Sequence, residues 1–253
     1  MRVDLNADLG EGFGAYSLGD DAAVLEVVTS ANIACGFHAG DPRVMDRTVG
    51  LAVRHGVALG AHPGHFDLRG FGRRAIPAEP AEIETDVLYQ VGALSAFAHA
   101  HGAGLVHVKP HGALYNQAAA DHVVARAIAR GVARAGRGLV LVGLAGSSVM
   151  RGAAEAEGLR FAAEAFADRR YEPDGSLRSR RHADAVLHDP ASAAAQAVSI
   201  VREGQAFDLD GRPVRVRADT LCIHGDAPGA AEVARAVRRA LEAAGVTVGA
   251  LTV

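Results

Sequence analysis

The chain of 253 residues contains no tryptophan, and only 5% of its residues are aromatic. Its interior must therefore be filled mainly by alanine, valine, leucine and isoleucine side chains. Cysteine is also scarce: Cys35 and Cys222 stand far apart, each within an apolar run, without the spacing of a metal-binding pair. We expect two buried, reduced thiols rather than a disulfide scaffold or a cysteine-based metal site.

Long apolar runs and a large excess of one charge are missing as well. No segment is long enough in apolar residues to span a bilayer, and the first residues enter a strand pattern without an apolar signal region. The net charge is −3, and the 22% of charged residues mix both signs. Binding to nucleic acid or to an anionic membrane is therefore not indicated. We expect an ordinary soluble protein of the cytoplasm.

Lysine is the most unevenly used residue, because Lys109 is the only lysine among 26 lysine and arginine residues. It ends the apolar run 105–108 and precedes a Pro-His-Gly turn, whereas a surface lysine normally lies on a polar helix face. Chance survival of one surface lysine is the alternative. Strand ends carry chemistry in α/β proteins, and an ammonium is compact and can lose its proton, unlike a guanidinium. We therefore expect Lys109 to be functional.

Strand and helix patterns alternate along the chain. Strands are predicted at residues 3–9, 31–37, 57–61, 105–108, 139–142, 159–163 and 220–223. Helices are predicted at residues 22–29, 42–55, 78–101, 118–135, 147–158, 190–203 and 230–244, with a small hairpin at 206–217. About seven such units favour one domain over residues 1–253 with an α/β fold, a parallel (β/α)7-type barrel. An open doubly wound sheet is the alternative, but its Gly-x-Gly-x-x-Gly turn is absent.

The first predicted strand alternates strictly between apolar and polar residues. If its polar face points into a barrel, the side chains of Asp4, Asn6 and Asp8 must hydrogen-bond to one another or to a ligand. The other strands are mostly apolar throughout, as expected for parallel strands that are buried on both faces.

The carboxyl ends of parallel barrel strands form one face, where functional sites lie. Six of the seven predicted strands bring an acid, a base or an amine to this face, namely Asp8, Glu11, His38, Asp41, His62, Lys109, His111, Glu164, Asp168, His224 and Asp226. Asp41 is better explained as a helix N-cap because Pro42 follows it, and Asp226 could cap the last helix. A single histidine after a strand is commonly bonded only to its own loop, but four at equivalent positions indicate a site.

Three arginines follow the third strand in a glycine-rich loop, at Arg69, Arg73 and Arg74. They either clamp an anionic group of a substrate or are merely solvated. The sequence does not decide between these two interpretations.

Two chemistries fit the predicted face. In the first, a divalent metal activates water, with Glu11, His38 and His62 as candidate ligands, although no His-Glu-x-x-His motif is present. In the second, Glu11 or Asp8 activates water without a metal, histidines carry protons, and Lys109 stabilises the developing oxyanion. A Schiff base on Lys109 is also chemically possible, but nothing in the sequence selects a carbonyl substrate.

Several longer motifs occur in collinear order from the first strand to about residue 228. They are Asp4-Leu5-Asn6, Asp8-Leu9-Gly10-Glu11-Gly12, Ala34-Cys35-Gly36-Phe37-His38-Ala39-Gly40-Asp41-Pro42, Gly60-Ala61-His62-Pro63-Gly64, Gly70-Phe71-Gly72-Arg73-Arg74, Val108-Lys109-Pro110-His111-Gly112-Ala113-Leu114-Tyr115-Asn116, Glu164-Ala165-Phe166-Ala167-Asp168-Arg169 and Cys222-Ile223-His224-Gly225-Asp226. Together these motifs resemble the LamB/YcsF family.

The resemblance implies a barrel of the glycoside-hydrolase and polysaccharide-deacetylase type. It also implies a 5-oxoprolinase activity, in which the lactam of 5-oxo-L-proline (pyroglutamate) is opened to L-glutamate with ATP hydrolysis. Two partner subunits of the 5-oxoprolinase, B and C, are implied as well. The chain contains no Walker-type Gly-x-x-x-x-Gly-Lys-Ser/Thr motif, so we expect the complex to use ATP largely on the partner subunits. A homo-oligomer is a further possibility.

The motifs also suggest roles for individual residues. Asp8, Glu11, His38, Lys109 and His111 are the expected catalytic residues, and a divalent metal on Glu11, His38 and His62 stays open. The expected substrate-binding residues are His62, Arg73, Glu164, Asp168, His224 and Asp226. A metal-dependent deacetylase of an amide or carbohydrate, and a non-catalytic lactam-binding protein of the complex, are the two alternative functions.

Overall fold

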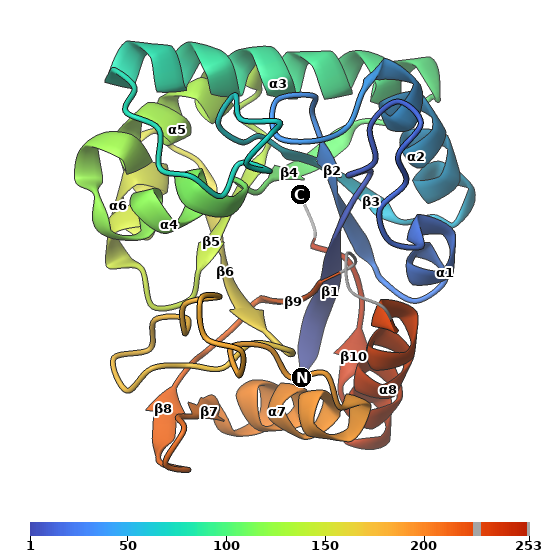
Figure 1. Cartoon of the computed structure of the whole chain (residues 1–253), viewed down its shortest axis with the longest axis vertical. Helices are drawn as coiled ribbons and strands as arrows, with labels where there is room; N and C mark the ends of the chain where they lie inside the picture. Colours follow the sequence, from blue (N-terminus) through green and yellow to red (C-terminus); the bar gives the residue numbers. More distant parts are fainter. Residues whose placement is uncertain (225–228, 252–253) are drawn as a thin grey trace.

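The computed structural model describes residues 1–224 and 229–251 of the chain, and it shows a closed parallel barrel surrounded by helices (Figure 1). The barrel strands are β1 (Arg2–Leu9), β2 (Ser30–Ala34), β3 (Ala58–His62), β4 (Leu105–Val108), β5 (Val140–Leu144), β6 (Arg160–Phe166) and β9 (Thr220–Ile223). Each strand is parallel to its neighbours, and β1 pairs with both β2 and β9, which closes the ring. The predicted (β/α)7 barrel is therefore confirmed, and the alternative of an open sheet is wrong.

The helices lie on the outside of this ring (Figure 1). They are α1 (Asp21–Leu25), α2 (Pro42–Arg54), α3 (Pro80–Ala100), α4 (Gly112–Ala120), α5 (His122–Ala135), α6 (Ser148–Ala156), α7 (Pro190–Glu203) and α8 (Ala230–Ala243). Asp41 and Asp189 cap α2 and α7, with a proline at the first helical position in each case. Within the described residues, none of these helices is both long and apolar enough to cross a membrane.

The single helix predicted over residues 118–135 is wrong, because two helices meet there. α4 begins directly after the Lys-Pro-His turn, and α5 begins after Asp121. The Asp121 carboxylate accepts hydrogen bonds from the amides of Val123 and Val124. This cap starts a new helix at a place where the alanine-rich sequence alone suggests continuation.

Three smaller features complete the fold. The predicted hairpin is confirmed as β7 (Gln205–Phe207) and β8 (Pro213–Arg215), which are antiparallel. The short strand β10 (Thr247–Val248) pairs with the start of β1 outside the ring. β6 continues to Phe166, three residues beyond the prediction, so Glu164 lies within a barrel strand.

The barrel interior is polar, and the main apolar core lies between the strands and the helices. Leu5 and Leu9 of β1 belong to that outer core, so the alternate residues Asp4, Asn6 and Asp8 face the barrel interior. Space inside is tight: a Cβ on Gly60 would lie 2.0 Å from Nε2 of His107. Glycine is therefore required on β3, because the imidazole of His107 on the neighbouring strand β4 lies directly over Gly60 on its way to Asn32 of β2.

Candidate functional site

A cavity of about 770 Å³ opens at the carboxyl ends of the barrel strands. Besides Arg73, its lining includes six residues that the sequence predicts for the site: Asp8, Glu11, His62, Lys109, His111 and His224. They follow or end four different strands, since Asp8 and Glu11 share β1 and Lys109 and His111 both follow β4. The position at the carboxyl face is the one expected for a functional site in a barrel of this kind.

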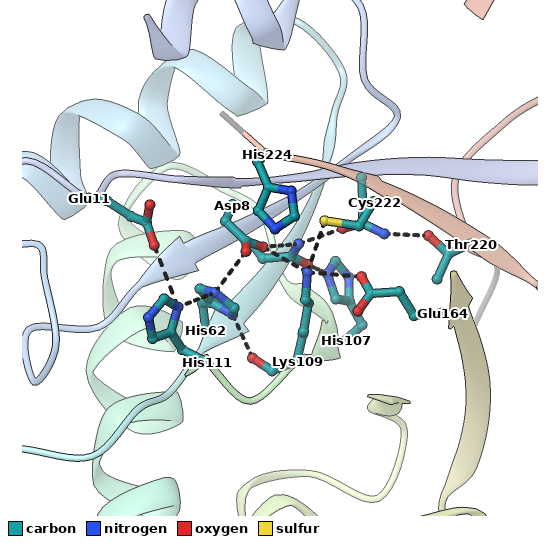
Figure 2. A network of polar contacts seen from close by, with 12 residues as sticks. Asp8, Glu11, His62, His107, Lys109, His111, Glu164, Thr220, Cys222 and His224 are labelled. Carbon is teal, nitrogen blue, oxygen red and sulfur yellow. Dashed lines mark hydrogen bonds and ion pairs between the residues drawn. The ribbon is translucent and has the colours of Figure 1, made fainter. Parts of the chain in front are cut away.

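Lys109 is buried on the floor of the cavity between three acceptors (Figure 2). Its Nζ lies 2.9 Å from Oδ1 of Asp8, 2.9 Å from Oε1 of Glu164 and 3.1 Å from Sγ of Cys222. Burial alone would lower the pKa of Lys109, but the charge of Asp8 and its other partners outweighs burial and raises this pKa well above its ordinary value. Lys109 is thus a charged ammonium, and this state disfavours the Schiff-base alternative.

Asp8 is held in place by a chain of buried side chains inside the barrel (Figure 2). The amide of Asn32 donates to Asp8 Oδ1 at 2.8 Å and to Asn6 Oδ1 at 2.7 Å, and Asn6 in turn donates to Thr220. Burial lowers the pKa of His107 to about 3, so its neutral ring donates from Nε2 to Asn32 Oδ1 at 2.7 Å. Burial would also raise the pKa of Asp8, but the charges of His62 and Lys109 lower it well below its ordinary value.

Two histidines beside Asp8 direct lone pairs toward each other. Nδ1 of His62 donates to the main-chain oxygen of Lys109 at 2.7 Å, and Nε2 of His111 donates to that of Phe71 at 2.8 Å. These carbonyl partners fix which nitrogen carries the proton when each ring is neutral. The remaining atoms, Nε2 of His62 and Nδ1 of His111, lie 2.9 Å apart. Two lone pairs at this distance repel each other unless a proton or a metal cation lies between them.

His38 strengthens the case for a cation in this cluster. Its ring is fully buried, stacks on His111 with 3.7 Å between ring centroids, and has no hydrogen-bond partner on either nitrogen. Burial and the nearby histidines lower the pKa of His38 well below its ordinary value, so the ring is neutral. Oε1 of Glu11 lies 3.4 Å from Nε2 of His38 and 3.6 Å from Nδ1 of His111.

One donor atom from each of Glu11, His38, His62 and His111 lies within 4.8 Å of the others. Three nitrogen donors and one carboxylate oxygen are the ligands that zinc and related divalent ions prefer. The carbonyl bonds behind His62 and His111 are typical of metal-binding histidines. The residues therefore fit a divalent metal ion, and His111 extends the ligand set predicted from the sequence.

A second histidine arrangement lies across the cavity. Nδ1 of His224 lies 2.9 Å from both carboxylate oxygens of Asp168, and Oδ2 also accepts a hydrogen bond from the main-chain N–H of His224. Burial would raise the pKa of Asp168, but the contacts with His224 lower it, so Asp168 is ionised. The His224 ring stacks on Phe166, whose other neighbour is Lys109 Nζ, 5.4 Å from the ring centroid. Asp168 thus orients His224 at the cavity wall, with Nε2 left for a ligand.

Residues 3–253 match the model of the LamB/YcsF family. The chain belongs to this family. It is 57% identical over 248 residues to a protein of Chloroflexus aggregans that is named as the A subunit of 5-oxoprolinase, and the match covers 98% of each chain. It is also similar to the solved structure of a lactam utilization protein from Thermus thermophilus, with 53% identity, a TM-score of 0.93, and coverage of 99% of this chain and 100% of that one.

The LamB/YcsF chain also shares its fold with a more distant solved structure. A T48 deacetylase with substrate aligns with a TM-score of 0.50 and 15% identity, covering 98% of this chain and 86% of that one. This likeness shows the fold alone and agrees with the deacetylase-type barrel expected from the resemblance. The names of the sequence relatives imply that their complexes contain other subunits.

Most residues predicted for the site of this LamB/YcsF protein lie together, and a few do not. Arg73 lies exposed at the cavity rim, with its guanidinium 4.8 Å from the centroid of the Phe71 ring. Arg74 points to Asp67, and Asp41 caps a helix and accepts the amide of Gly14. The predicted substrate-binding residue Asp226 lies outside the described residues.

Sequence reasoning missed several inward-facing residues of the LamB/YcsF barrel: Asn32, His107, Arg169 and the role of Cys222 as a partner of Lys109. The signal that could have found two of them is strand parity. His107 lies two residues before Lys109 on β4, and Cys222 lies two residues before His224, so each pair shares the inward face. Tertiary contacts alone identify Asn32 and Arg169.

Proposed function

We propose that this chain, as one domain over residues 1–253, is the A subunit of a cytoplasmic 5-oxoprolinase and opens the lactam of 5-oxo-L-proline to L-glutamate. It would act together with B and C subunits and with ATP hydrolysis by the complex. Support comes from the whole-chain family match and from the names of relatives with more than 50% identity. The observation that carries the proposal is the buried ammonium of Lys109 at the floor of a polar cavity.

Lys109 is suited to stabilise the oxygen of the opening lactam. Its ammonium lies close to two carboxylates and one thiol, and a thiol is the weakest acceptor of the three. An incoming lactam oxygen can replace the Cys222 contact at the smallest cost in free energy. The ammonium then opposes the negative charge that develops on this oxygen in the transition state.

When no metal is bound, Glu11 fits the role of general base better than Asp8; with a metal bound, Glu11 would be a ligand instead. Asp8 already accepts hydrogen bonds from Lys109 and Asn32 and contacts His62, and its lowered pKa makes it a weak base. Glu11 lies beside the histidines at the cavity and is not tied to Lys109. We assign His224, oriented by Asp168, to substrate binding on the opposite wall.

A divalent metal would be held by Glu11, His38, His62 and His111. When bound there, such an ion polarises an amide carbonyl or lowers the pKa of water. The same cluster favours a second candidate function, metal-dependent hydrolysis of another amide or of an acetylated carbohydrate. In that case Glu11 would be a ligand, and the base would be sought elsewhere on the carboxyl face.

ATP chemistry belongs to the partner subunits in this proposal, because the chain has no Walker-type phosphate loop. The partners would phosphorylate the lactam oxygen, and this chain would complete the ring opening. Phosphorylation makes the ring carbon more electrophilic, so that water adds to it and the ring C–N bond breaks as the nitrogen takes up a proton. A second water then hydrolyses the resulting acyl phosphate to L-glutamate and phosphate, which couples ATP hydrolysis to ring opening.

The test measures glutamate and ADP formation from 5-oxo-L-proline and ATP with this chain and its cognate B and C subunits. We expect glutamate only when all three are present. If this chain alone forms glutamate at the full rate of the mixture, the division of labour is wrong. If a Glu11→Gln/Lys109→Met double variant supports the full rate, the chain only binds the lactam.

A further inference from the structure

One end of the cavity has an excess of positive charge that the proposed ring-opening groups do not use. The segment 174–181 between β6 and α7 forms this wall and carries Arg178, Arg180 and Arg181, and Arg169 lies beside them. Arg178 is neutralised by Glu172 at 3.1 Å and Asp184 at 2.8 Å. No carboxylate among the described residues lies within ion-pair distance of the other three. The small ring of a lactam leaves much of the 770 Å³ cavity to groups at this end.

Arg169 stands out because its charge is buried and forms no ion pair among the described residues, although the carboxylate of Asp168 acts on it at longer range. Its side chain is only 7% exposed. Nε donates to the main-chain oxygen of Ala185 at 3.2 Å, and Nη2 donates to that of Arg178 at 2.6 Å. Burial and the nearby charge of Arg180 lower the pKa of Arg169 to about 10, which still leaves the guanidinium charged at neutral pH.

A purely structural role does not account for this charge. The two carbonyl contacts use two of the five N–H groups of the guanidinium. A neutral glutamine could donate to carbonyls in the same segment without the free-energy cost of a buried, unpaired cation. Arg169 lines the cavity. A ligand with an oxyanion would compensate the charge and satisfy the remaining donors at the same time.

The position of Arg169 in the chain connects it to the proposed reaction centre. β6 directs alternate residues inward, so that Glu164 reaches Lys109, Phe166 lies between Lys109 and His224, and Asp168 orients His224. Arg169 is the next residue. Arg169 and Lys109 line the same cavity, so one molecule that fills it can contact both.

We propose that Arg169, assisted by Arg180, is the anion site of this cavity and binds an oxyanion of the substrate. This inference rests on the proposed function, in which the substrate is a lactam acid. The oxyanion is either the carboxylate of that acid or the phosphoryl group of its activated form, and a guanidinium recognises both through paired N–H donors.

The experiment measures binding to the full chain by calorimetry with three probes: 5-oxo-L-proline, 2-pyrrolidinone, which lacks the carboxylate, and inorganic phosphate. Wild type should bind 5-oxo-L-proline roughly 10- to 100-fold more tightly than 2-pyrrolidinone, as expected for one charge-assisted pair. Arg169→Gln should abolish this difference and leave 2-pyrrolidinone binding unchanged. Arg126→Gln, an exposed arginine on α5, is the matched control and should change nothing.

Two further variants separate anion binding from a structural role. Arg169→Lys keeps the charge and should retain part of the preference for 5-oxo-L-proline, whereas a structural role makes it as damaging as Arg169→Gln. Arg180→Gln alters an exposed side chain, so the fold should persist while the preference falls by roughly threefold or more. If Arg169→Gln fails to fold, this variant decides the question.

The outcomes also separate the two oxyanions and the two proposals. If wild type shows no preference for 5-oxo-L-proline and Arg169→Gln loses phosphate binding, the site binds the phosphoryl group. The anion site is overturned if both arginine variants keep the preference for 5-oxo-L-proline and keep phosphate binding. It is also overturned if wild type binds no anion. If the three-subunit mixture forms no glutamate while the preference for 5-oxo-L-proline still depends on Arg169, the proposed function is overturned instead.

Discussion

The two halves of the carboxyl face differ in whether their charges and lone pairs are satisfied. Around Lys109, every charged group faces an opposite charge or a hydrogen-bond donor from the barrel interior. In the cluster of Glu11, His38, His62 and His111, Nε2 of His62 faces Nδ1 of His111, and neither nitrogen of His38 has a hydrogen-bond partner. The two halves meet where Nε2 of His62 lies 3.3 Å from Asp8. The first half is complete in charge, although the Glu164 carboxylate accepts no hydrogen bond from the described residues, whereas the second half is completed only by a proton or a metal cation.

The difference predicts opposite responses to mutation. Removing a member of the complete half leaves buried charges without partners, which costs both stability and activity. Removing a member of the incomplete half relieves repulsion between lone pairs, so the protein stays folded while metal binding is lost. Stability and function are therefore coupled around Lys109 and separable around His111.

The largest effect is expected from Lys109. Lys109→Met should lower the activity of the full complex by about a thousandfold or more and the free energy of unfolding by about 3–5 kcal/mol. Lys109→Arg should also fail, because the larger guanidinium does not fit between Asp8 and Glu164. Glutamate formation and urea unfolding measure the two effects.

A compensating variant serves as the control for this first experiment. Lys109→Met/Glu164→Gln removes one unpaired carboxylate, so part of the stability should return while the activity stays low. Near-normal activity of Lys109→Arg would show that a compact ammonium is not required.

The second effect concerns the histidine cluster. Wild type, stripped with a chelator and titrated with zinc, should bind one ion per chain and gain thermal stability. His111→Ala should weaken zinc binding by about a hundredfold or more, while its unfolding free energy without metal stays within about 1 kcal/mol of wild type. Metal analysis and thermal unfolding check both statements.

Lys109→Met provides the matched comparison, because it should still bind zinc although it is inactive. Equal zinc affinities for wild type and His111→Ala would mean that the cluster is not a metal site.

The third effect is smaller and concerns Cys222. Since a lactam oxygen is proposed to replace its contact with Lys109, Cys222→Ala should lower kcat by less than about tenfold. Burial also raises the pKa of the Cys222 thiol well above its ordinary value, so neither Cys222 nor the buried Cys35 should react with iodoacetamide before unfolding. Steady-state kinetics and mass spectrometry of the alkylated protein measure these results. A hundredfold fall in kcat would instead place the thiol in the chemistry.

The smallest effect is expected at Asp67, which anchors the loop that supplies the Phe71 carbonyl to His111. Hydrogen bonds from Arg74 lower the pKa of Asp67 from 3.8 to about 2. A lowered carboxyl pKa stabilises the folded state above about pH 4, and this contribution is lost as the pH falls toward 2. Asp67→Asn should therefore lower the free energy of unfolding by about 1 kcal/mol or less at pH 7, since Arg74 is largely exposed. Near pH 2 the variant and wild type should be equally stable. If the difference in unfolding free energy between Asp67→Asn and wild type stays the same from pH 7 to pH 2, the ion pair between Asp67 and Arg74 is not the cause of that difference.

Much of the fold could be predicted because local patterns and tertiary structure agree. The alternation in β1 correctly predicts which residues face inward, and Asp41 with Pro42 begins a helix as expected. The split between α4 and α5 was not predicted, because Asp121 is a single capping residue in an alanine-rich stretch that otherwise favours one long helix.

The site was predictable in position but less so in its contacts. Strand ends identified the carboxyl face, and His38, His62 and His111 do lie together. The sequence could not show that carbonyl groups fix the tautomers of His62 and His111, or that Arg169 lacks an anion. These properties depend on main-chain atoms of distant segments, such as Phe71 and Ala185, which no residue pattern encodes.

The closure of the ring through β1 and β9 has a consequence for synthesis on the ribosome. Asp4 and Asn6 find their partner Thr220 only across 216 and 214 positions of the chain. The first strand to emerge therefore waits for nearly the last one before its polar face can be satisfied. Until then β1 presents an open edge, and contacts of such long range form slowly. A chain interrupted before Thr220 should be held by chaperones or aggregate rather than persist as a partial barrel.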